Sequence, residues 1–341
     1  MSEPTVNRAW TLASRPKGQV RIDDFLLVTG PRDTTELADG DIRVRNRLFA
    51  VSPTIRNWLN PIGNVGRGSI PLGGVIMGMT GSEVLESCHP KFAAGDRLVA
   101  FSRWEDVSVL TPDRAVVPAF SVPTSMTFEE AMGALSPNTL TAYFGLIEVG
   151  RPLLGETVVV SAAAGSVGSV VCQIARILGC RVVAIAGSAE KCAWLKDICR
   201  ADATVDYKSE NIAERLKALC PGGVNVYFDN VGGDILEAAV DVMAVRGRIV
   251  LCGQISAYDT GKPAPGPRDM MRLVYGQIRM EGFVVGAFVD QVDEARARLR
   301  GWIKSGDLIV RTDIRHGLEA LPSAFTDLFS GRNQGTLLVR A

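Results

Sequence analysis

The sequence has few residues that bind metals. Its 341 residues include only two histidines, His89 and His316, and its seven cysteines form no Cys-x-x-Cys pair. Protein zinc sites need clustered Cys, His and carboxylate ligands, so we expect no metal and assign both histidines structural or solvent-exposed roles, with His89 in a surface loop. An odd number of scattered cysteines also argues against a disulfide framework, so we interpret them as reduced, mostly structural thiols.

The sequence also lacks an excess of either charge and any long apolar run. Lys plus Arg equals Asp plus Glu at 37 each, and no basic block stands out, which argues against a nucleic-acid partner. The first ten residues, MSEPTVNRAW, do not resemble a secretory signal, and no later run is apolar enough to span a membrane. We therefore predict a cytoplasmic protein that acts on a small molecule.

The length and the 47% of hydrophobic residues are enough for two domains, each with its own core. Up to about residue 135, short apolar runs such as Arg97 to Phe101 are broken by Gly, Pro and Asp, a pattern typical of a β-rich domain. From Thr157, apolar runs (TVVVSA, RVVAIAG, NVYFDNV and RIVLCG) alternate with helical segments, which indicates a parallel sheet in an α/β domain. We expect helices at Ala189 to Cys199 and at about Val292 to Lys304, and a last strand, Thr336 to Val339, that returns to the first domain.

A glycine-containing turn follows the first of these strands. The run SAAAGSVG at residues 161–168 lies between a β-branched strand and an amphipathic helix that ends near Gly179, the context of a dinucleotide-binding turn. Gly165 would let the backbone approach a pyrophosphate, and Gly168 would allow close packing of helix on strand. Ala163 replaces the first glycine of the usual motif. The alternative is an ordinary turn of small residues, which the succession of β-α units makes less favourable.

The end of the second strand indicates which cofactor is bound. An NAD-binding domain normally carries Asp or Glu here for the ribose 2′-hydroxyl, whereas this chain has Gly187 followed by Ser188 and, on the next helix, Lys191. A hydroxyl and an ammonium favour a 2′-phosphate, so we predict NADPH. The alternative is that Lys191 is an ordinary solvated lysine.

Beyond these patterns, the chain resembles a known family along nearly its whole length. The stretches that carry the likeness are LTAYFGL, SAAAGSVGSVVCQIA, AGSAEKCAWLK, VDYK, VYFDNVGG and LCGQISAYD, with RPKG near the start and GRNQGTLLVR at the end. They are similar to the zinc-independent medium-chain dehydrogenase/reductases, in particular the branch of prostaglandin reductases, leukotriene dehydrogenase, plant double-bond reductases and bacterial curcumin reductase.

The resemblance implies a fold and a set of roles. The fold is a Rossmann doubly wound parallel sheet domain at residues 136–304 plus a GroES-like β-rich catalytic domain at residues 1–135 and 305–341. Residues that would hold the pyrophosphate are Gly165, Ser166, Val167 and Gly168, and those around the 2′-phosphate are Ser188, Lys191 and Tyr207. The nicotinamide half would be lined by Asn230, Cys252, Gly253, Gln254, Ile255, Ser256, Tyr258, Phe283, Val284, Val285 and Asn333.

One departure from the family concerns the substrate pocket. Members of this branch usually carry Asp-Pro-Tyr-Met-Arg near the active site, and this chain reads SPTIR at residues 52–56. We place Thr54 and Arg56 in the pocket, where Thr54 removes an aromatic stacking contact. The segment GFVVGAFVDQ also lacks aromatics at positions where relatives often have them, so the pocket differs in shape.

Tyr258 is the candidate catalytic residue. It follows the strand RIVLCG and should lie near the carboxyl edge of the sheet, where nicotinamide and substrate meet. The alternative is a loop tyrosine that packs on the proline-rich segment YDTGKPAPGP. Tyr258 and Lys262 also have the Y-x-x-x-K spacing of short-chain dehydrogenases, but Gly261 and Pro263 would interrupt the helix that this pair needs. No G-x-S-x-G motif of an α/β-hydrolase is present.

The resulting prediction is an NADPH-dependent reductase of α,β-unsaturated ketones and aldehydes, with hydride added to the β-carbon and a proton to the α-carbon. The alternatives are an NADPH quinone oxidoreductase and a catalytically silent NADPH-binding sensor. Because relatives pair that way, and because an uncovered strand edge is prone to association, we also expect a homodimer through the sheet edge near Met280 to Val285.

Overall fold

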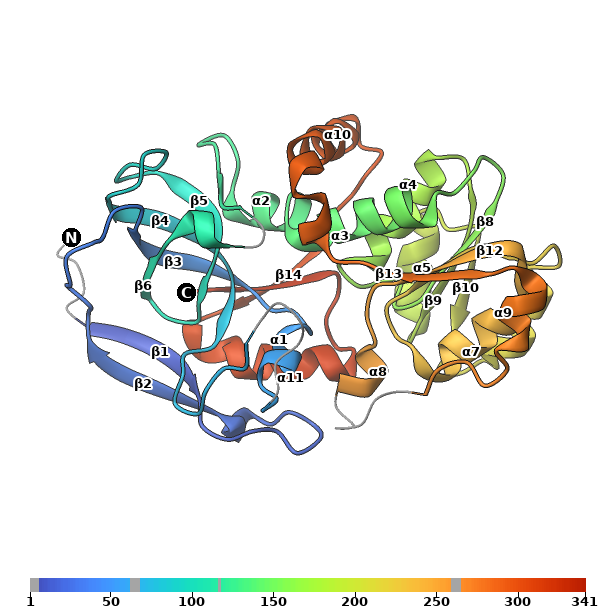
Figure 1. The fold of residues 1–341 in the computed structure, drawn as a ribbon, viewed down its shortest axis with the longest axis horizontal. Coiled ribbons are helices and arrows are strands. Elements are labelled where there is room, and N and C mark those ends of the chain that lie inside the picture. The colour runs from blue at the N-terminus through green and yellow to red at the C-terminus, as the bar shows by residue number, and fades with distance from the viewer. Residues whose placement is uncertain (1–5, 62–67, 116–117, 259–264) are drawn as a thin grey trace. The chain divides into compact units, whose positions relative to one another are not determined.

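The computed structural model describes residues 6–61, 68–115, 118–258 and 265–341. They divide into two compact units, Met1–Gly133 with Thr312–Ala341, and Ala134–Arg311. The α/β fold class predicted from the sequence is confirmed, because one unit contains a parallel Rossmann-like sheet and the other is β-rich (Figure 1). No helix among the described residues is long and apolar enough to cross a membrane.

The parallel sheet of the second unit has the strand order β10-β9-β8-β11-β12-β13. All five neighbouring pairs are parallel. Numbered along the chain, this is the order 3-2-1-4-5-6 of a doubly wound dinucleotide-binding sheet, in which the direction of winding reverses between the first and fourth strands. These two strands are β8 and β11. The strands are β8 Thr157–Val160, β9 Arg181–Ala186, β10 Ala203–Asp206, β11 Val224–Asp229, β12 Met243–Leu251 and β13 Arg279–Gly282.

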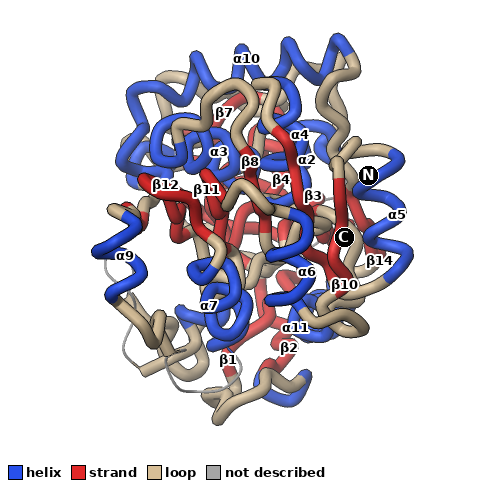
Figure 2. Tube along the Cα trace, turned by 90° about the vertical axis from the view of Figure 1, so that its right-hand side faces the viewer, coloured by secondary structure: helices blue, strands red, loops and turns tan. Residues whose placement is uncertain are grey.

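Helices cover both faces of this sheet, because its strands are apolar on both sides. Alternate residues of β8 pack into different clusters, Val158 and Val160 into one and Val159 into the other. Helices α3 and α4 lie on one face and α6 and α7 on the opposite face (Figure 2). The helices of this unit are α3 Pro137–Phe144, α4 Gly168–Ile177, α5 Ala189–Asp197, α6 Ile212–Leu219, α7 Gly233–Asp241, α8 Ile255–Tyr258, α9 Met271–Gly276 and α10 Val292–Ser305.

The β-rich unit is built around a mixed sheet of order β14-β15-β3-β4-β5-β7, with β6 paired to β3. The chain's last strand, β15, pairs with β3, so the predicted return to the first domain is confirmed. Its strands are β1 Val6–Leu12, β2 Phe25–Pro31, β3 Ile42–Ala50, β4 Met77–Ser87, β5 Arg97–Arg103, β6 Val107–Leu110, β7 Phe120–Ser121, β14 Thr312–His316 and β15 Thr336–Arg340, and its helices are α1 Ile55–Trp58, α2 Phe128–Ala134 and α11 Leu321–Ser330.

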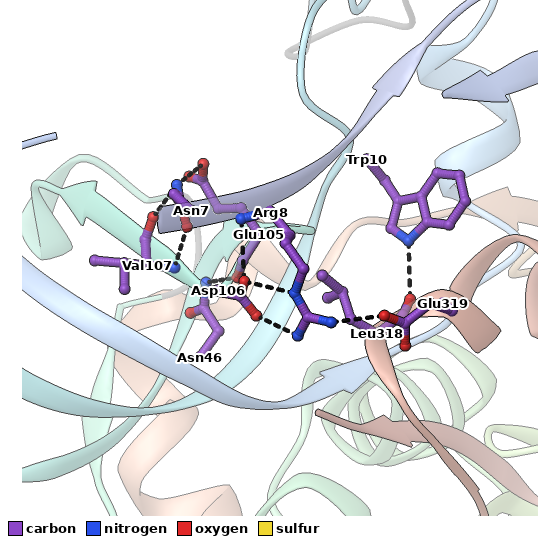
Figure 3. A network of polar contacts seen from close by, with 9 residues as sticks. All are labelled: Asn7, Arg8, Trp10, Asn46, Glu105, Asp106, Val107, Leu318 and Glu319. Atoms are coloured by element: carbon purple, nitrogen blue, oxygen red, sulfur yellow. Dashed lines mark hydrogen bonds and ion pairs between the residues drawn. The ribbon is translucent and has the colours of Figure 1, made fainter. Parts of the chain in front are cut away.

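A polar network ties the start of the chain to the corner between β5 and β6 (Figure 3). The Arg8 guanidinium donates to both carboxylate oxygens of Asp106 at 2.9 Å and to Glu319 at 2.6 Å. Beside it, the buried carboxylate of Glu105 accepts hydrogen bonds from Ser108 Oγ at 2.8 Å and Asn7 Nδ2 at 3.1 Å. The network thus joins β1, the corner between β5 and β6, and the C-terminal segment of this unit.

His89 has the structural one of the two roles expected for it. The residue follows β4 in a loop, as expected, but its side chain is buried rather than solvent-exposed. Nδ1 accepts a hydrogen bond from the backbone N–H of Lys91 at 3.1 Å, so the ring hydrogen is on Nε2, which donates to Asp113 at 3.2 Å. The ring also packs on Phe92. His89 therefore stabilises its loop.

Candidate cofactor and active site

The turn between β8 and α4 leaves no room for side chains at two positions. A Cβ at Gly168 would lie 2.5 Å from the carbonyl oxygen of Ala162, and a Cβ at Gly165 would lie 3.2 Å from the same oxygen. Ala162 itself has a left-handed φ of 45°, which is uncommon for a residue other than glycine. The tight packing at Gly168 and the half-buried position of Gly165 fit a turn that admits a pyrophosphate.

The first turn of α4 is built to receive an anion. Its N-cap is Val167, and no side chain of the described residues caps it. The backbone N–H groups at a helix N-terminus and the helix dipole both favour a phosphate. Next to this turn, Ser166 Oγ accepts a hydrogen bond from Asn138 Nδ2 of α3 at 3.0 Å, which orients the serine. The structure thus brings together the four residues predicted to hold the pyrophosphate, and their contacts with it stay a prediction.

A second group of predicted residues gathers at the end of β9. A Cβ at Gly187 would lie 2.6 Å from the ring of Tyr207, so this ring lies directly against the glycine backbone. Ser188 is the N-cap of α5, and its Oγ accepts a hydrogen bond from the backbone N–H of Lys191 at 3.2 Å. The serine hydroxyl can still donate its hydrogen to a ligand. The Ser188 hydroxyl and the Tyr207 phenol therefore lie at the turn where an NAD-binding domain carries its acid, and Lys191 lies in the first turn of the helix that follows.

A buried carboxylate that was not predicted from the sequence lies at the end of β11. Asp229 is 1% exposed, and its Oδ1 accepts hydrogen bonds from Tyr227 OH at 2.8 Å, Ser161 Oγ at 3.1 Å and the backbone N–H groups of Val231 and Gly232 at 3.0 Å. Burial, with the nearby Asp229 charge, holds the pKa of Tyr227 well above its usual range, so the phenol keeps its hydrogen. The available signal was a charged residue that closes an apolar strand run, VNVYFD.

Asn230, predicted at the nicotinamide, is fixed by the same strand ends. Its backbone N–H donates to Ser161 Oγ at 2.8 Å, and its side-chain Nδ2 donates to the Ser161 carbonyl oxygen at 2.7 Å. Ser161 directly follows β8 and Asn230 directly follows β11, so these bonds cross the place where the winding of the sheet reverses. Ligands of doubly wound sheets bind outside the carboxyl ends of the strands at this place.

The segment Cys252 to Tyr258 lies on the same edge of the sheet. The N–H groups of Cys252 and Gly253 donate to the Asp229 carbonyl oxygen at 2.9 and 3.1 Å, and Ser256 Oγ donates to the Val231 carbonyl oxygen at 2.5 Å. Ile255 N–H bonds to the Asn230 carbonyl oxygen at 3.3 Å. A Cβ at Gly232 would lie 2.6 Å from Gln254 Cγ, so this side chain also contacts the turn after β11.

Two side chains of this segment carry chemistry. Burial and the nearby Asp229 charge raise the pKa of the Cys252 thiol to about 12, so it stays protonated and is no nucleophile at neutral pH. Tyr258 is the last residue of α8, and its hydroxyl would lie 3.7 Å from a Cβ on Gly253. The hydroxyl therefore lies over the start of the loop that follows β12. Lys262, Gly261 and Pro263, weighed above as a short-chain dehydrogenase pattern, lie outside the described residues.

The segment Phe283 to Val285 presents one side chain outward. Phe283 packs into the core at Gly145 and meets Phe228 edge to face, with ring centroids 6.4 Å apart. Val285 packs on the same core, whereas Val284 is 69% exposed. Of the three, Val284 is therefore the residue whose side chain can contact a cofactor. Phe283 has a packing role that the sequence did not indicate.

Three predicted residues belong to the β-rich unit. Arg56 is 1% exposed and donates to Asn60 Oδ1 at 2.6 Å and to the Gly18 carbonyl oxygen at 3.1 Å, so its guanidinium holds two loops of this unit together. Thr54 is exposed at the start of α1. Asn333 donates through Nδ2 to the Gly335 carbonyl oxygen at 3.1 Å. Their roles toward substrate and nicotinamide stay predictions.

Comparison with family models identifies both parts of the chain. Residues 8–117 match the model described as the N-terminal domain of oxidoreductase, and residues 166–300 match the model described as zinc-binding dehydrogenase. Within the described residues, no group of three or more His, Cys, Asp or Glu side chains is arranged to hold a metal ion.

Relatives match over almost the full length. The NADPH-dependent curcumin reductase of Escherichia coli is 33% identical, over 98% of this chain and 96% of its own. The NADP(+)-dependent 2-alkenal reductase of Nicotiana tabacum is 37% identical, over 88% and 87%. The crystal structure of CurA from Vibrio vulnificus in complex with NADPH superposes with a TM-score of 0.89 at 32% identity, covering 98% of this chain and 99% of that one. The chain belongs to the zinc-independent medium-chain dehydrogenase/reductases, in the branch of the curcumin, prostaglandin and 2-alkenal reductases.

Proposed function

We propose that this protein is an NADPH-dependent reductase of the C=C bond in α,β-unsaturated ketones and aldehydes. The observation that carries the proposal is the carboxyl edge of the parallel sheet, which combines the glycine turn of residues 165–168 with the turn of Gly187, Ser188 and Lys191, where glycine replaces the usual acid at the end of the strand. The first fits a pyrophosphate and the second a 2′-phosphate. Both relatives described above are named for NADPH or NADP, and one of them for 2-alkenals.

Bound NADPH would supply the hydride that the β-carbon of the substrate receives. The chain's own residues would bind the cofactor and orient it. The backbone of residues 165–168 would hold the pyrophosphate, and Ser188, Lys191 and Tyr207 would hold the 2′-phosphate. Asn230 and the segment Cys252 to Tyr258 would keep the nicotinamide half at the ends of β11 and β12, where their mutual hydrogen bonds fix the loops.

Tyr258 would act on the substrate's carbonyl oxygen. Adding hydride to the β-carbon moves negative charge onto this oxygen before the α-carbon is protonated. A phenolic O–H donor placed there stabilises the developing charge more than it stabilises the neutral substrate, which is the condition for a catalytic effect. Tyr258 fits this role among the described tyrosines, because its hydroxyl lies over Gly253 at this edge of the sheet.

The remaining parts of the proposal rest on the sequence and on the family. Residues 136–304 would form the cofactor domain, and residues 1–135 and 305–341 the catalytic domain, with Thr54 and Arg56 in the substrate pocket and Asn333 at the nicotinamide. The cytoplasmic location also stays a prediction.

A homodimer is part of the proposal. Strand β13 ends the order of the parallel sheet and pairs on one side with β12, and Val284 just beyond it is 69% exposed. An unpaired strand edge beside apolar residues favours association with a second copy. Sedimentation analysis tests this, and a strictly monomeric protein would contradict it.

The decisive experiment for the activity measures NADPH consumption with a panel of enals, enones and quinones and identifies each product. We expect saturated ketones and aldehydes from enones and enals. Reduced quinones alone would favour a quinone oxidoreductase, and NADPH binding without turnover of any substrate would favour a binding protein.

A further inference from the structure

The ends of β8 and β11 are joined by a hydrogen-bonded array whose centre is Asp229. In the strand order these two strands are neighbours, and the winding of the sheet reverses between them. Ser161 follows one strand and Asp229 closes the other, with 3.1 Å between Ser161 Oγ and Asp229 Oδ1. The array therefore occupies the place where a doubly wound sheet binds its ligand, although the carboxylate itself is buried and cannot touch one.

We propose that Asp229 is the positioning residue of this site. Its carboxylate fixes the conformation of the turn at residues 230–233. This turn then places Asn230 where it can contact the nicotinamide half of the cofactor. The identity of the ligand rests on the proposed function. The array itself rests on the contacts of Asp229.

The carboxylate shapes the turn by receiving its backbone hydrogens. Oδ1 accepts from Val231 N–H and Gly232 N–H at 3.0 Å, and Oδ2 accepts from the same Gly232 N–H at 3.1 Å. Gly232 and Gly233 have positive φ values of 71° and 58°, so the chain reverses in a conformation that residues other than glycine seldom adopt. A buried charge needs such donors, and the turn supplies them only when it is closed around the carboxylate.

The position of Asn230 follows from the same carboxylate. Ser161 Oγ donates its single hydrogen to Asp229 and thereby turns a lone pair toward the backbone N–H of Asn230, at 2.8 Å. The Asn230 side chain is held through Nδ2 at the Ser161 carbonyl oxygen, and its Oδ1 is the acceptor that we assign to the ligand. A nicotinamide carboxamide or a ribose hydroxyl can donate to such an oxygen.

The loop after β12 depends on the same arrangement. Carbonyl oxygens of Asp229, Asn230 and Val231 accept hydrogen bonds from the segment Cys252 to Ser256. A change at Asp229 is therefore passed to two of the segments predicted at the nicotinamide, whereas Ser188 and Lys191 follow β9, which is separated from β11 by β8 in the sheet. A change at Asp229 should therefore weaken binding of the nicotinamide half of the cofactor more than binding of the 2′-phosphate half.

The test compares two ligands on Asp229→Asn, a variant that keeps the shape but removes the charge and one acceptor. We expect the dissociation constant for NADPH to rise about tenfold, as for weakened hydrogen bonds to a charged group. For 2′,5′-ADP, which carries only the adenosine and 2′-phosphate half, it should change less than about twofold. Both constants come from titration calorimetry, with thermal unfolding measured on the same samples.

Two further variants separate positioning from general stability. Tyr227→Phe removes one donor to Asp229 and keeps the ring, so we expect the same selective loss of NADPH affinity, about threefold. Leu216→Ala in α6 lowers stability from within the adjacent core and should leave the ratio of the two dissociation constants unchanged.

Equal weakening of both ligands by Asp229→Asn, or no weakening of either, would overturn the proposal. Failure of the unmodified protein to bind NADPH would instead overturn the proposed function. An unmodified protein that binds both ligands, with a ratio that Asp229→Asn leaves unchanged, would retain the function and remove the positioning role.

Discussion

Two buried carboxylates, one in each unit, show how differently the same group is used. Glu105 lies at the corner between β5 and β6 and is 6% exposed, and Asp229 at the end of β11 is 1% exposed. Glu105 accepts from side chains, Ser108 and Asn7, and has Arg103 at 3.7 Å. Asp229 accepts two backbone N–H groups of the turn that follows it, besides two hydroxyls.

The difference teaches that burial alone does not mark a functional carboxylate. The partners of Glu105 lie on β1 and β6, which belong to two different sheets of the same unit, so its network holds β1 against a corner of the larger sheet (Figure 3). The partners of Asp229 belong to a loop at the carboxyl edge of a parallel sheet, where the fold itself directs a ligand. If this distinction is correct, variants on the sheet edge should alter binding or turnover, and variants at the corner should alter stability.

The largest effect is expected at Tyr258. Tyr258→Phe keeps the ring and removes the donor to the developing oxyanion, so kcat should fall about 100-fold, the lower end for loss of one such donor. NADPH affinity should change much less. Steady-state kinetics with an enone and titration of NADPH measure the two quantities.

Tyr275→Phe provides the matched control, since Tyr275 is 78% exposed on α9 and its variant should keep full turnover. If Tyr258→Phe also keeps nearly full turnover while Tyr258→Ala loses it, the ring acts by packing, and the proton comes from water or a ribose hydroxyl.

A smaller effect on the same edge is expected at Lys191. Lys191→Ala should weaken NADPH binding by about 1.5 kcal/mol, the lower end for a hydrogen bond to a charged group, because the side chain is half-buried and partly screened by water. NADH affinity should barely change, since it has no 2′-phosphate. Lys196→Ala, an exposed lysine in the last turn of the same helix, is the control. Equal losses for both cofactors would show that Lys191 supports the fold instead of binding the phosphate.

The same comparison explains what the sequence could predict. The parallel sheet, the helix after the glycine turn and the return of β15 were predictable because apolar periodicity and glycine spacing are local signals. The Asp229 array was not, because Ser161 and Asn230 are 69 residues apart and only the strand order makes them neighbours. Which of its two expected roles His89 has could not be decided from the sequence for a similar reason: its partner Asp113 lies 24 residues further along the chain.

The roles of Phe283 and Arg56 show a second limit. Both were placed at the site by resemblance, and a motif gives a residue's position in the chain but not the direction of its side chain. Phe283 packs into the core against Phe228, and Arg56 bonds to the Gly18 carbonyl oxygen and Asn60. Direction depends on which neighbours fill the space, and those come from distant segments.

The smallest effect is expected at Glu105, and it should appear in stability alone. Burial raises the pKa of Glu105 above its ordinary value, against the opposing effects of Ser108, Arg103 and Asn7. The protonated acid is therefore favoured more in the folded protein than in the unfolded chain. Its contribution to stability is full below the pKa of the unfolded chain and is lost as the pH rises through the folded pKa.

Glu105→Gln cannot titrate, and its amide gives up the hydrogen bond with Asn7 Nδ2. At pH 4 we expect the variant to unfold about 2 °C below the unmodified protein, the loss of one neutral hydrogen bond in a chain of this size. This difference in unfolding temperature should narrow or reverse between pH 4 and 8, because only the unmodified protein then buries a charge.

Glu130→Gln gives the opposite trend, since a backbone hydrogen bond from Thr127 lowers the pKa of Glu130 and its stabilisation is lost as the pH falls. Thermal unfolding across this range, with NADPH affinity measured in parallel, decides the matter: a Glu105 variant that alters NADPH affinity would mean that the corner network also serves the site, and that the distinction between the two carboxylates is wrong.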